Sequence, residues 1–217
     1  MYIRKHLFLF IAILFFLIPS IDSKSNELPK NIDFTVTRNG KEFGFHKIEF
    51  KRQDNGDLVV KIDIELEVKL GFVKLFSYKH ENKEIWRDGK LFQISTKTDD
   101  NGKIFFINGK LANQGFIINT QDGTKVLPLN IMPTSYWNFS NIDNRNWLDT
   151  QRGILLDLDI SYYGSDNIKD FYGKQILAEK YNVSNDLNLF LWYHNNSLVK
   201  IAFDARGGSS KIDYFMR

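Results

Sequence analysis

The sequence predicts an all-β fold, a single antiparallel meander of about 11 to 13 strands that curls into a barrel or half-barrel. Apolar and polar residues alternate with a period of two, most clearly in "LVVKIDIELEVKL" from Leu58 to Leu70. Asn-Gly and Asp-Gly pairs, which tolerate the positive φ of tight turns, recur between the alternating segments. So many strands bury a common apolar face only if the sheet curls, which leaves a closed barrel and a half-barrel as the two alternatives.

The N-terminus is organised like a secretory signal peptide. A basic start, "MYIRKH", precedes the apolar run "LFLFIAILFFLI" and the small residues of "SIDSKS". The run from Leu7 to Ile18 has 12 residues, and a bilayer-spanning helix needs roughly 20, so a retained anchor is disfavoured. We expect residues 1–23 to be removed by cleavage after Ser23 or after Ser25. The mature chain is then exported to the periplasm, or secreted, without a membrane span.

Composition limits the function of the mature chain. Nothing marks a domain boundary within residues 24–217, so we expect them to form a single β domain. They contain 27 basic and 25 acidic residues, interspersed along the chain, and this near balance argues against nucleic-acid binding. The sequence has no cysteine, so an exported chain cannot form a disulfide and depends on its core for stability.

Turn signals such as "RNGK", "QDNGD", "RDGK", "DDNGK", "NGK" at 108–110 and "QDGT" divide the chain into strands. In order, the predicted strands are residues 32–38, 41–51, 58–69, 73–86, 90–98, 103–108, 115–120, 124–129, 154–163, 173–182, 187–194, 198–206 and 210–216. In the segment from Leu58 to Leu70 the even positions are apolar, so we expect that face to point into the core.

Residues near 132–153 lack alternation and predict a short helical or irregular excursion. The segment contains "PTSYWNFSNIDNRNWLDTQRG", which is rich in capping and aromatic residues. Thr134 fits the cap of a short helix that carries Tyr136 and Trp137, and a second helical turn fits "NWLDTQ". A plug or a lid of the curled sheet is the expected role.

The segment "LFLWYHNNSLVKIAF" predicts a hairpin that turns at Asn195 and Asn196. Both faces of its first strand are largely apolar, so we expect this strand to be covered on both sides, with the segment around Trp137 as one candidate cover. His194 then lies beside the turn, where an exposed imidazole is favoured over a catalytic base or a metal ligand.

Other chemical motifs favour structural interpretations. "DDNG" at 99–102 lacks the acidic residue that completes a calcium loop and fits a hairpin turn. Asp157 and Asp159 alternate with apolar residues and fit a solvated strand face. The sequence lacks a G-x-S-x-G nucleophile motif, and its mature histidines lack metal-ligand spacing. We therefore predict no catalytic residue, no metal ligand and no cofactor.

Six segments together resemble a family of exported bacterial proteins known as DUF6134, a domain of unknown function. In chain order they are "YKHENKEIWRDGKL", "TKTDDNGK", "MPTSYWN", "LDTQRG", "LWYHNNSLV" and "GGSSKIDYFMR". The resemblance covers nearly the whole mature chain and departs from the family at His194, where the family has an acidic or small residue. It implies a periplasmic β-rich fold and brings no assigned activity, catalytic residue or cofactor.

Three classes of function stay open. A carrier of an apolar or amphipathic ligand, such as a lipid, is favoured over a structural or protein-interaction protein with a filled core, and an enzyme is favoured least. In the carrier, we expect the ligand to contact Trp86, Tyr136, Trp137 and Trp192. The segment without alternation carries "SYWN" and the strand that is apolar on both faces carries "LWY", so we expect the two to cover each other and to form an aromatic seam. Packing of the same rings without a ligand is the competing interpretation. The sequence does not indicate an oligomeric state.

Overall fold

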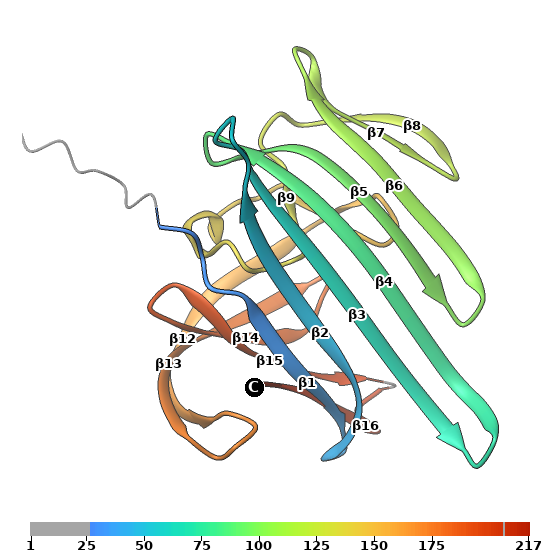
Figure 1. The fold of residues 1–217 in the computed structure, drawn as a ribbon, viewed down its shortest axis with the longest axis vertical. Helices are drawn as coiled ribbons and strands as arrows, with labels where there is room; N and C mark the ends of the chain where they lie inside the picture. The colour runs from blue at the N-terminus through green and yellow to red at the C-terminus, as the bar shows by residue number, and fades with distance from the viewer. Residues whose placement is uncertain (1–26, 206) are drawn as a thin grey trace, which may run out of the picture.

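The computed structural model describes residues 27–205 and 207–217, which form sixteen strands and contain no α-helix (Figure 1). The predicted leader and both expected cleavage points lie outside the described residues. The elements are β1 (Ile32–Arg38), β2 (Lys41–Arg52), β3 (Leu58–Leu70), β4 (Val73–Arg87), β5 (Lys90–Asp100), β6 (Lys103–Ala112), β7 (Gly115–Thr120), β8 (Gly123–Leu127), β9 (Met132–Pro133), a 3₁₀ turn η1 (Phe139–Asn141), β10 (Trp147–Leu148), β11 (Leu155–Leu156), β12 (Leu158–Lys169), β13 (Gln175–Asn185), β14 (Leu189–His194), β15 (Ser197–Ala205) and β16 (Ser210–Met216).

Thirteen of these strands form one curled antiparallel sheet, which confirms the predicted all-β meander. Their order is β12-β13-β14-β15-β16-β1-β2-β3-β4-β5-β6-β7-β8, so each strand pairs with its neighbours in sequence except where β16 meets β1. At that junction Val36 lies opposite Tyr214, and the Arg217 N–H donates to the Asp33 carbonyl at 2.9 Å. Among the described strands β8 and β12 are the two edges, so the half-barrel is the form adopted.

The thirteen predicted strands correspond to the thirteen strands of this sheet, although most of their ends differ by one to six residues. Two of the larger differences have identifiable reasons. Asn108-Gly109 is not a turn, because Gly109 lies inside β6, where a Cβ atom would come within 2.5 Å of the Phe116 ring. Glycine is therefore needed there for close packing. β12 continues to Lys169 through a β-bulge beside Gly164, whose φ of +131° lets the strand resume its pairing.

The alternation of β3 sorts its side chains as predicted as far as Leu66, but Val59 on the odd face is also buried, and Leu70 on the even face is exposed because the end of the strand extends beyond the core. Val60 and Ile62 are buried on the even face and Ile64 is half-buried, whereas Lys61 and Asp63 on the odd face are exposed. The even face belongs to the main core, which lines the concave side of the sheet. The register therefore follows from the sequence pattern.

Residues 128–157, here called the inner segment, connect the two edge strands and pack against the concave face. The predicted excursion near 132–153 is irregular, and its two expected helical turns are wrong. Thr134 does not cap a helix, and its backbone N–H donates to the Leu148 carbonyl at 3.0 Å. Trp147 and Leu148 form β10, which pairs with β9 in parallel and with β11 in antiparallel orientation. Strand pairing satisfies backbone groups that would otherwise be buried without partners. η1 is the helical turn present in the described part of this segment.

The β14–β15 hairpin is confirmed, with a turn at Asn195 and Asn196. Both asparagines have positive φ, +49° and +61°, as a two-residue hairpin turn requires. Leu191 and Tyr193 join the main core, whereas Trp192 joins a second cluster with Val199 and Ala202 on the opposite face. Both faces are therefore covered, but the Trp192 face is covered by neighbouring strands and not by the segment around Trp137.

No helix in the described part of the chain has the length and apolar character needed to cross a membrane.

Candidate ligand-binding site

The inner face of β4 carries a run of buried polar side chains. His80, Asn82, Glu84 and Trp86 are two residues apart and therefore point the same way. All four are buried, and Glu84 has no exposed surface. This row of polar groups faces the inner segment and marks the interior of the half-barrel as a polar site.

Glu84 accepts three hydrogen bonds, two from its own strand and one, from Trp137, that links the sheet to the inner segment. Asn82 Nδ2 donates to Glu84 Oε1 at 2.9 Å. The Nε1 groups of Trp86 and Trp137 donate to Glu84 Oε2 at 2.8 and 3.0 Å. Burial raises the pKa of the Glu84 carboxyl, and the hydrogen bonds from Trp137, Trp86 and Asn82 oppose that shift. The hydrogen-bonding capacity of this carboxyl group is thus largely used in holding the fold together.

Aromatic packing fixes the first half of the inner segment. The Trp137 ring lies edge to face against Trp86 and Phe50, with centroid distances of 5.1 and 5.2 Å. Tyr136 has a positive φ of +56°, and its carbonyl accepts a 2.7 Å hydrogen bond from the Tyr193 hydroxyl. The backbone at Tyr136 is therefore held in the left-handed region by a contact from β14.

Asp149 organises the second half, in the "LDTQRG" motif. Its Oδ1 accepts the backbone N–H groups of Gln151 and Arg152 at 2.8 and 3.0 Å. The Arg152 Nε donates to Asp149 Oδ2 at 2.7 Å. This turn directs the Gln151 amide to Tyr78 and Asp100, each at 3.3 Å. The motif therefore positions one amide side chain against the inner face of β4 and β5.

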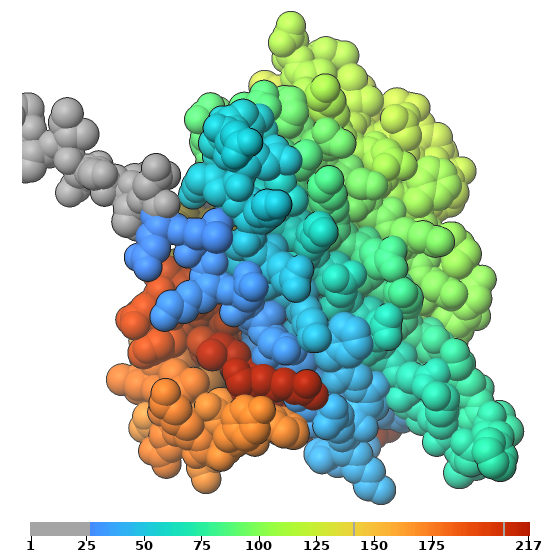
Figure 2. All heavy atoms as spheres, in the orientation of Figure 1, coloured from blue at the N-terminus to red at the C-terminus, as the bar shows by residue number. Residues whose placement is uncertain are grey.

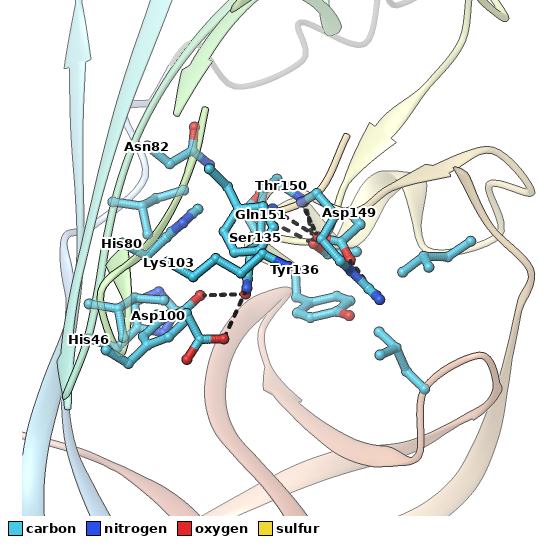
Figure 3. Close-up of a pocket in the computed structure, with 18 residues that line it drawn as sticks. His46, His80, Asn82, Asp100, Lys103, Ser135, Tyr136, Asp149, Thr150 and Gln151 are labelled. Carbon is cyan, nitrogen blue, oxygen red and sulfur yellow. Dashed lines mark hydrogen bonds and ion pairs between the residues drawn. The ribbon is translucent and has the colours of Figure 1, made fainter. Parts of the chain in front are cut away.

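A cavity of about 510 Å³ lies between the inner segment and strands β2 to β6 (Figure 3). Its polar wall includes His46, His80, Asn82, Tyr136 and Gln151. Its apolar wall includes Ile62, Ile64, Phe105, Leu156 and Leu187. The volume falls within the ~300–1,000 Å³ of small-molecule sites.

Two buried histidines, His46 and His80, contribute neutral hydrogen-bonding groups to the polar wall. The His46 ring lies between the rings of Phe34 and Tyr214, 5.8 and 5.7 Å away between centroids. Burial, with a smaller contribution from His80, lowers the pKa of His46 to about 3. Burial lowers the pKa of His80 to about 4, and His80 Nδ1 lies 2.8 Å from Thr98 Oγ1. Both imidazoles are neutral at neutral pH, and each then has one donor and one acceptor nitrogen.

Several buried polar atoms of this wall have no hydrogen-bond partner among the described residues. They are both ring nitrogens of His46, Oδ1 of Asn82 and the hydroxyl of Tyr136. Buried polar groups in native proteins are nearly always hydrogen-bonded, so a cluster of unpaired ones beside a cavity indicates a place for another molecule. Within residues 27–205 and 207–217 no group of three or more acidic or histidine side chains is placed to hold a metal ion.

The structure separates the four aromatic residues proposed from the sequence. Trp86, Tyr136 and Trp137 lie together in the interior, but of these only Tyr136 lines the cavity. Trp192 lies on the other face of the sheet, where its Nε1 donates to Asp166 Oδ2 at 3.1 Å. The ammonium groups of Lys180 and Lys200 lie 5.2 and 5.0 Å from its ring centroid. The four rings therefore do not form one site.

Apart from Tyr136, the residues that line the polar wall were not proposed from the sequence as site residues. His80, Asn82 and Glu84 occupy alternate positions of "KHENKEIW", on the face that also carries Trp86. Polar residues on the core face of a strand are the signal that identifies this site, because burying them is unfavourable unless they have partners.

A curled, open sheet packed around its own connecting segment defines a β-barrel-like domain. The chain belongs to the DUF6134 family, a domain of unknown function whose family model matches residues 34–217. This confirms the resemblance drawn from the sequence motifs, and the family carries no assigned activity.

A similar solved structure is the beta-barrel-like protein of domain of unknown function DUF1849 from Brucella abortus. It is 12% identical, with a TM-score of 0.59, and the alignment covers 88% of this chain and 96% of that chain. At this identity the similarity shows the fold alone. No curated protein matches the chain.

Proposed function

We propose that the protein is an exported binding protein that holds a small amphipathic molecule between its sheet and its inner segment. The observation that carries this proposal is the cavity of about 510 Å³ whose wall contains the unpaired polar atoms of His46, Asn82 and Tyr136. A bound molecule with hydrogen-bonding groups would satisfy those atoms.

The lining residues narrow the chemistry of the ligand. The acidic groups nearby already have partners: Glu84 accepts hydrogen bonds from two indoles and Asn82, Asp149 pairs with Arg152, and Asp100 accepts a hydrogen bond from the Gln151 amide. The buried groups without a partner are neutral and include both donors and acceptors, so they suit a hydroxyl or an amide better than an ion, whereas the Lys103 ammonium at the cavity is exposed to solvent. Ile62, Ile64 and Phe105 supply an apolar surface for the rest of the molecule. The proposed ligand is therefore amphipathic and uncharged at its polar end, not simply apolar.

The aromatic residues take a supporting role in this proposal. Tyr136 contacts the ligand directly, whereas Trp86 and Trp137 form the layer behind the cavity wall. Because both indoles are bonded to Glu84, they hold the inner segment in place over the cavity. Trp192 has no part in this site.

A filled structural protein is the second candidate, and the close packing of Trp86, Trp137 and Phe50 favours it. The two candidates differ in whether a molecule occupies the cavity. Protein purified from its native envelope without detergent should release an amphipathic molecule on organic extraction, identified by mass spectrometry.

A fluorescence titration tests the same proposal in solution. Long-chain alcohols, fatty amides and monoacylglycerols should change tryptophan emission on binding, because Trp137 and Trp147 lie in the inner segment. His46→Phe keeps a ring between Phe34 and Tyr214 but removes both nitrogens, so it should weaken binding about tenfold. His194→Phe, at the exposed turn of β14, is the matched control and should bind like the native protein. If no molecule is extracted and no titrated compound changes the emission of the folded protein, the filled structural protein replaces the carrier.

A further inference from the structure

The β3–β4 hairpin extends beyond the ends of its two neighbouring strands, β2 and β5. β2 pairs with β3 as far as Gly44 opposite Leu66, and β5 pairs with β4 as far as Asp100 opposite Tyr78. Beyond these points β3 and β4 pair with each other, with Val68 opposite Phe76 and Leu70 opposite Val73. Residues 67–76, here called the finger, therefore form a two-stranded projection, visible at the lower right of Figures 1 and 2.

The tip of the finger is apolar and exposed. The exposed fractions are 71% for Leu70, 60% for Val73 and 57% for Leu75, and Phe72 is fully exposed. Exposed apolar groups gathered at one point usually mark a surface that contacts another molecule. An isolated two-stranded hairpin is only marginally stable in water, and side chains exposed at its tip add little to that stability. Contact with another molecule therefore explains the apolar tip better than a role in folding does.

The composition of this turn differs from that of other hairpin turns in the chain. Asn39-Gly40, Asp88-Gly89, Asn101-Gly102 and Asn195-Asn196 are polar pairs at positive φ. In the finger the turn is Gly71-Phe72, in which Gly71 alone supplies the positive φ, +58°. A tight turn has no need of phenylalanine, so Phe72 at the end of the projection serves another purpose.

Two lysines lie directly behind the apolar tip. Lys69 and Lys74 are adjacent across the hairpin, and both ammonium groups pair with Glu67, Lys74 at 3.1 Å. The finger has two lysines and one glutamate and so carries a net positive charge. Lysine stems can lie along apolar surface while their ammonium groups reach lipid phosphates, and anionic lipid attracts such a cluster.

We propose that the finger inserts its tip into the interface of an anionic lipid bilayer, with Leu70, Phe72 and Val73 at the acyl boundary and Lys69 and Lys74 at the phosphates. A lipid surface suits a convex projection because it needs no matching shape. A stable protein partner would need about 800 Å² of surface on each side, which four side chains at one hairpin tip do not provide. This inference goes beyond the proposed function and does not depend on the cavity.

Vesicle flotation of the mature chain tests the proposal. The native protein should float with vesicles of phosphatidylethanolamine and phosphatidylglycerol, and less with phosphatidylcholine alone. Phe72→Asn, which gives a Gly-Asn turn, should lower the partition coefficient about tenfold or more. Lys69→Gln with Lys74→Gln should weaken binding to the anionic vesicles and leave binding to the neutral ones unchanged. Phe106→Ser, at another exposed phenylalanine, is the matched control and should float like the native protein.

Three results would overturn the proposal. The first is that the native protein, folded by circular dichroism, floats with neither vesicle. The second is that Phe72→Asn floats as well as the native protein does. The third is that sedimentation velocity shows a dimer that Phe72→Asn abolishes, which would make a second copy of the chain the partner of the finger.

Discussion

Trp86 on β4 and Trp137 on the inner segment donate their indole N–H groups to the same carboxylate oxygen of Glu84, and their rings meet at 80° with centroids 5.1 Å apart. One ring comes from the sheet and the other from the connection between its two edges. A half-barrel whose edges do not pair is therefore held in shape by a polar contact in its interior as well as by apolar packing. The same contact sets the position of Tyr136, the neighbour of Trp137 that lines the cavity.

Glu84→Leu should destabilise the fold by about 3 kcal/mol or more, because two indole N–H groups and the Asn82 amide would lose their buried acceptor. The free energy of unfolding in urea measures this change. The stability of Glu84→Gln should lie between that of Glu84→Leu and that of the native protein, since glutamine keeps one acceptor oxygen. Glu81→Leu, on the exposed face of the same strand, is the control and should change stability by no more than about 0.5 kcal/mol. Similar losses at the two positions would contradict the role assigned to Glu84.

Stability should fall as the pH is lowered below 6.5. The folded-state pKa values of His46 and His80, about 3 and about 4, lie below the ordinary value of 6.5. Between 6.5 and about 4 the unfolded chain therefore binds protons that the folded chain does not, and each histidine lowers stability by about 1.4 kcal/mol per pH unit. Glu84 acts in the opposite sense, because its raised pKa adds stability that is complete at low pH and is lost as the pH rises through that value.

The contribution of His46 to this pH dependence can be isolated. His46→Phe keeps the ring contacts with Phe34 and Tyr214 and removes the titration, so it should flatten the curve of unfolding free energy against pH. Denaturant titrations at pH 7, 6, 5 and 4.5 measure the curve for both proteins. An unchanged slope in the variant would show that His46 is not buried as described.

Asn196→Gly should stabilise the β14–β15 hairpin by about 0.5 kcal/mol, because glycine adopts the φ of +61° at this position without steric penalty. Asn196→Val should destabilise it by about 1–3 kcal/mol, since a β-branched residue is strained there. Thermal unfolding of the two variants beside the native protein measures both changes. The opposite order of melting temperatures would contradict the turn geometry.

Export with removal of the leader is expected from the basic, apolar and small-residue order of Arg4 to Ser25. Intact-mass measurement of protein from the cell envelope should give a chain that begins at Lys24 or Asn26. A mass that still includes Met1 to Ser23 would exclude this processing.

The sheet could be predicted because its information is local. Alternation in β3 sets the buried face, and polar pairs such as Asn101-Gly102 set the turns, so strand order in a meander follows directly. Gly109 misled the prediction because its reason is a distant ring, Phe116, which local sequence does not reveal. The inner segment could not be predicted in detail, because its pairing does not follow from local propensity. The Thr134 N–H donates to Leu148 and Trp147 lies opposite Met132, partners that are 14 or 15 residues away in the sequence.

The candidate site was predicted only in part for a related reason. Aromatic residues suggested an apolar site, yet Trp192 lies across the sheet from Trp137, and which face each ring takes depends on the whole register. His46 and Asn82 come from strands that are not adjacent, and only the curl of the sheet places both on the wall of one cavity. A polar residue on a core-facing position is the local sign that remains, and three such residues occur in "KHENKEIW".

The pairing of β1 with β16 has a consequence for the making of the protein. β1 acquires one of its two neighbours only when β16, Ser210–Met216, has been synthesised. Contacts so distant along the chain form slowly, and a growing polypeptide cannot complete this sheet from its N-terminal part. One edge of β1 therefore stays without its partner strand until β16 has been made, while the hairpins from β2 to β8 can already pair.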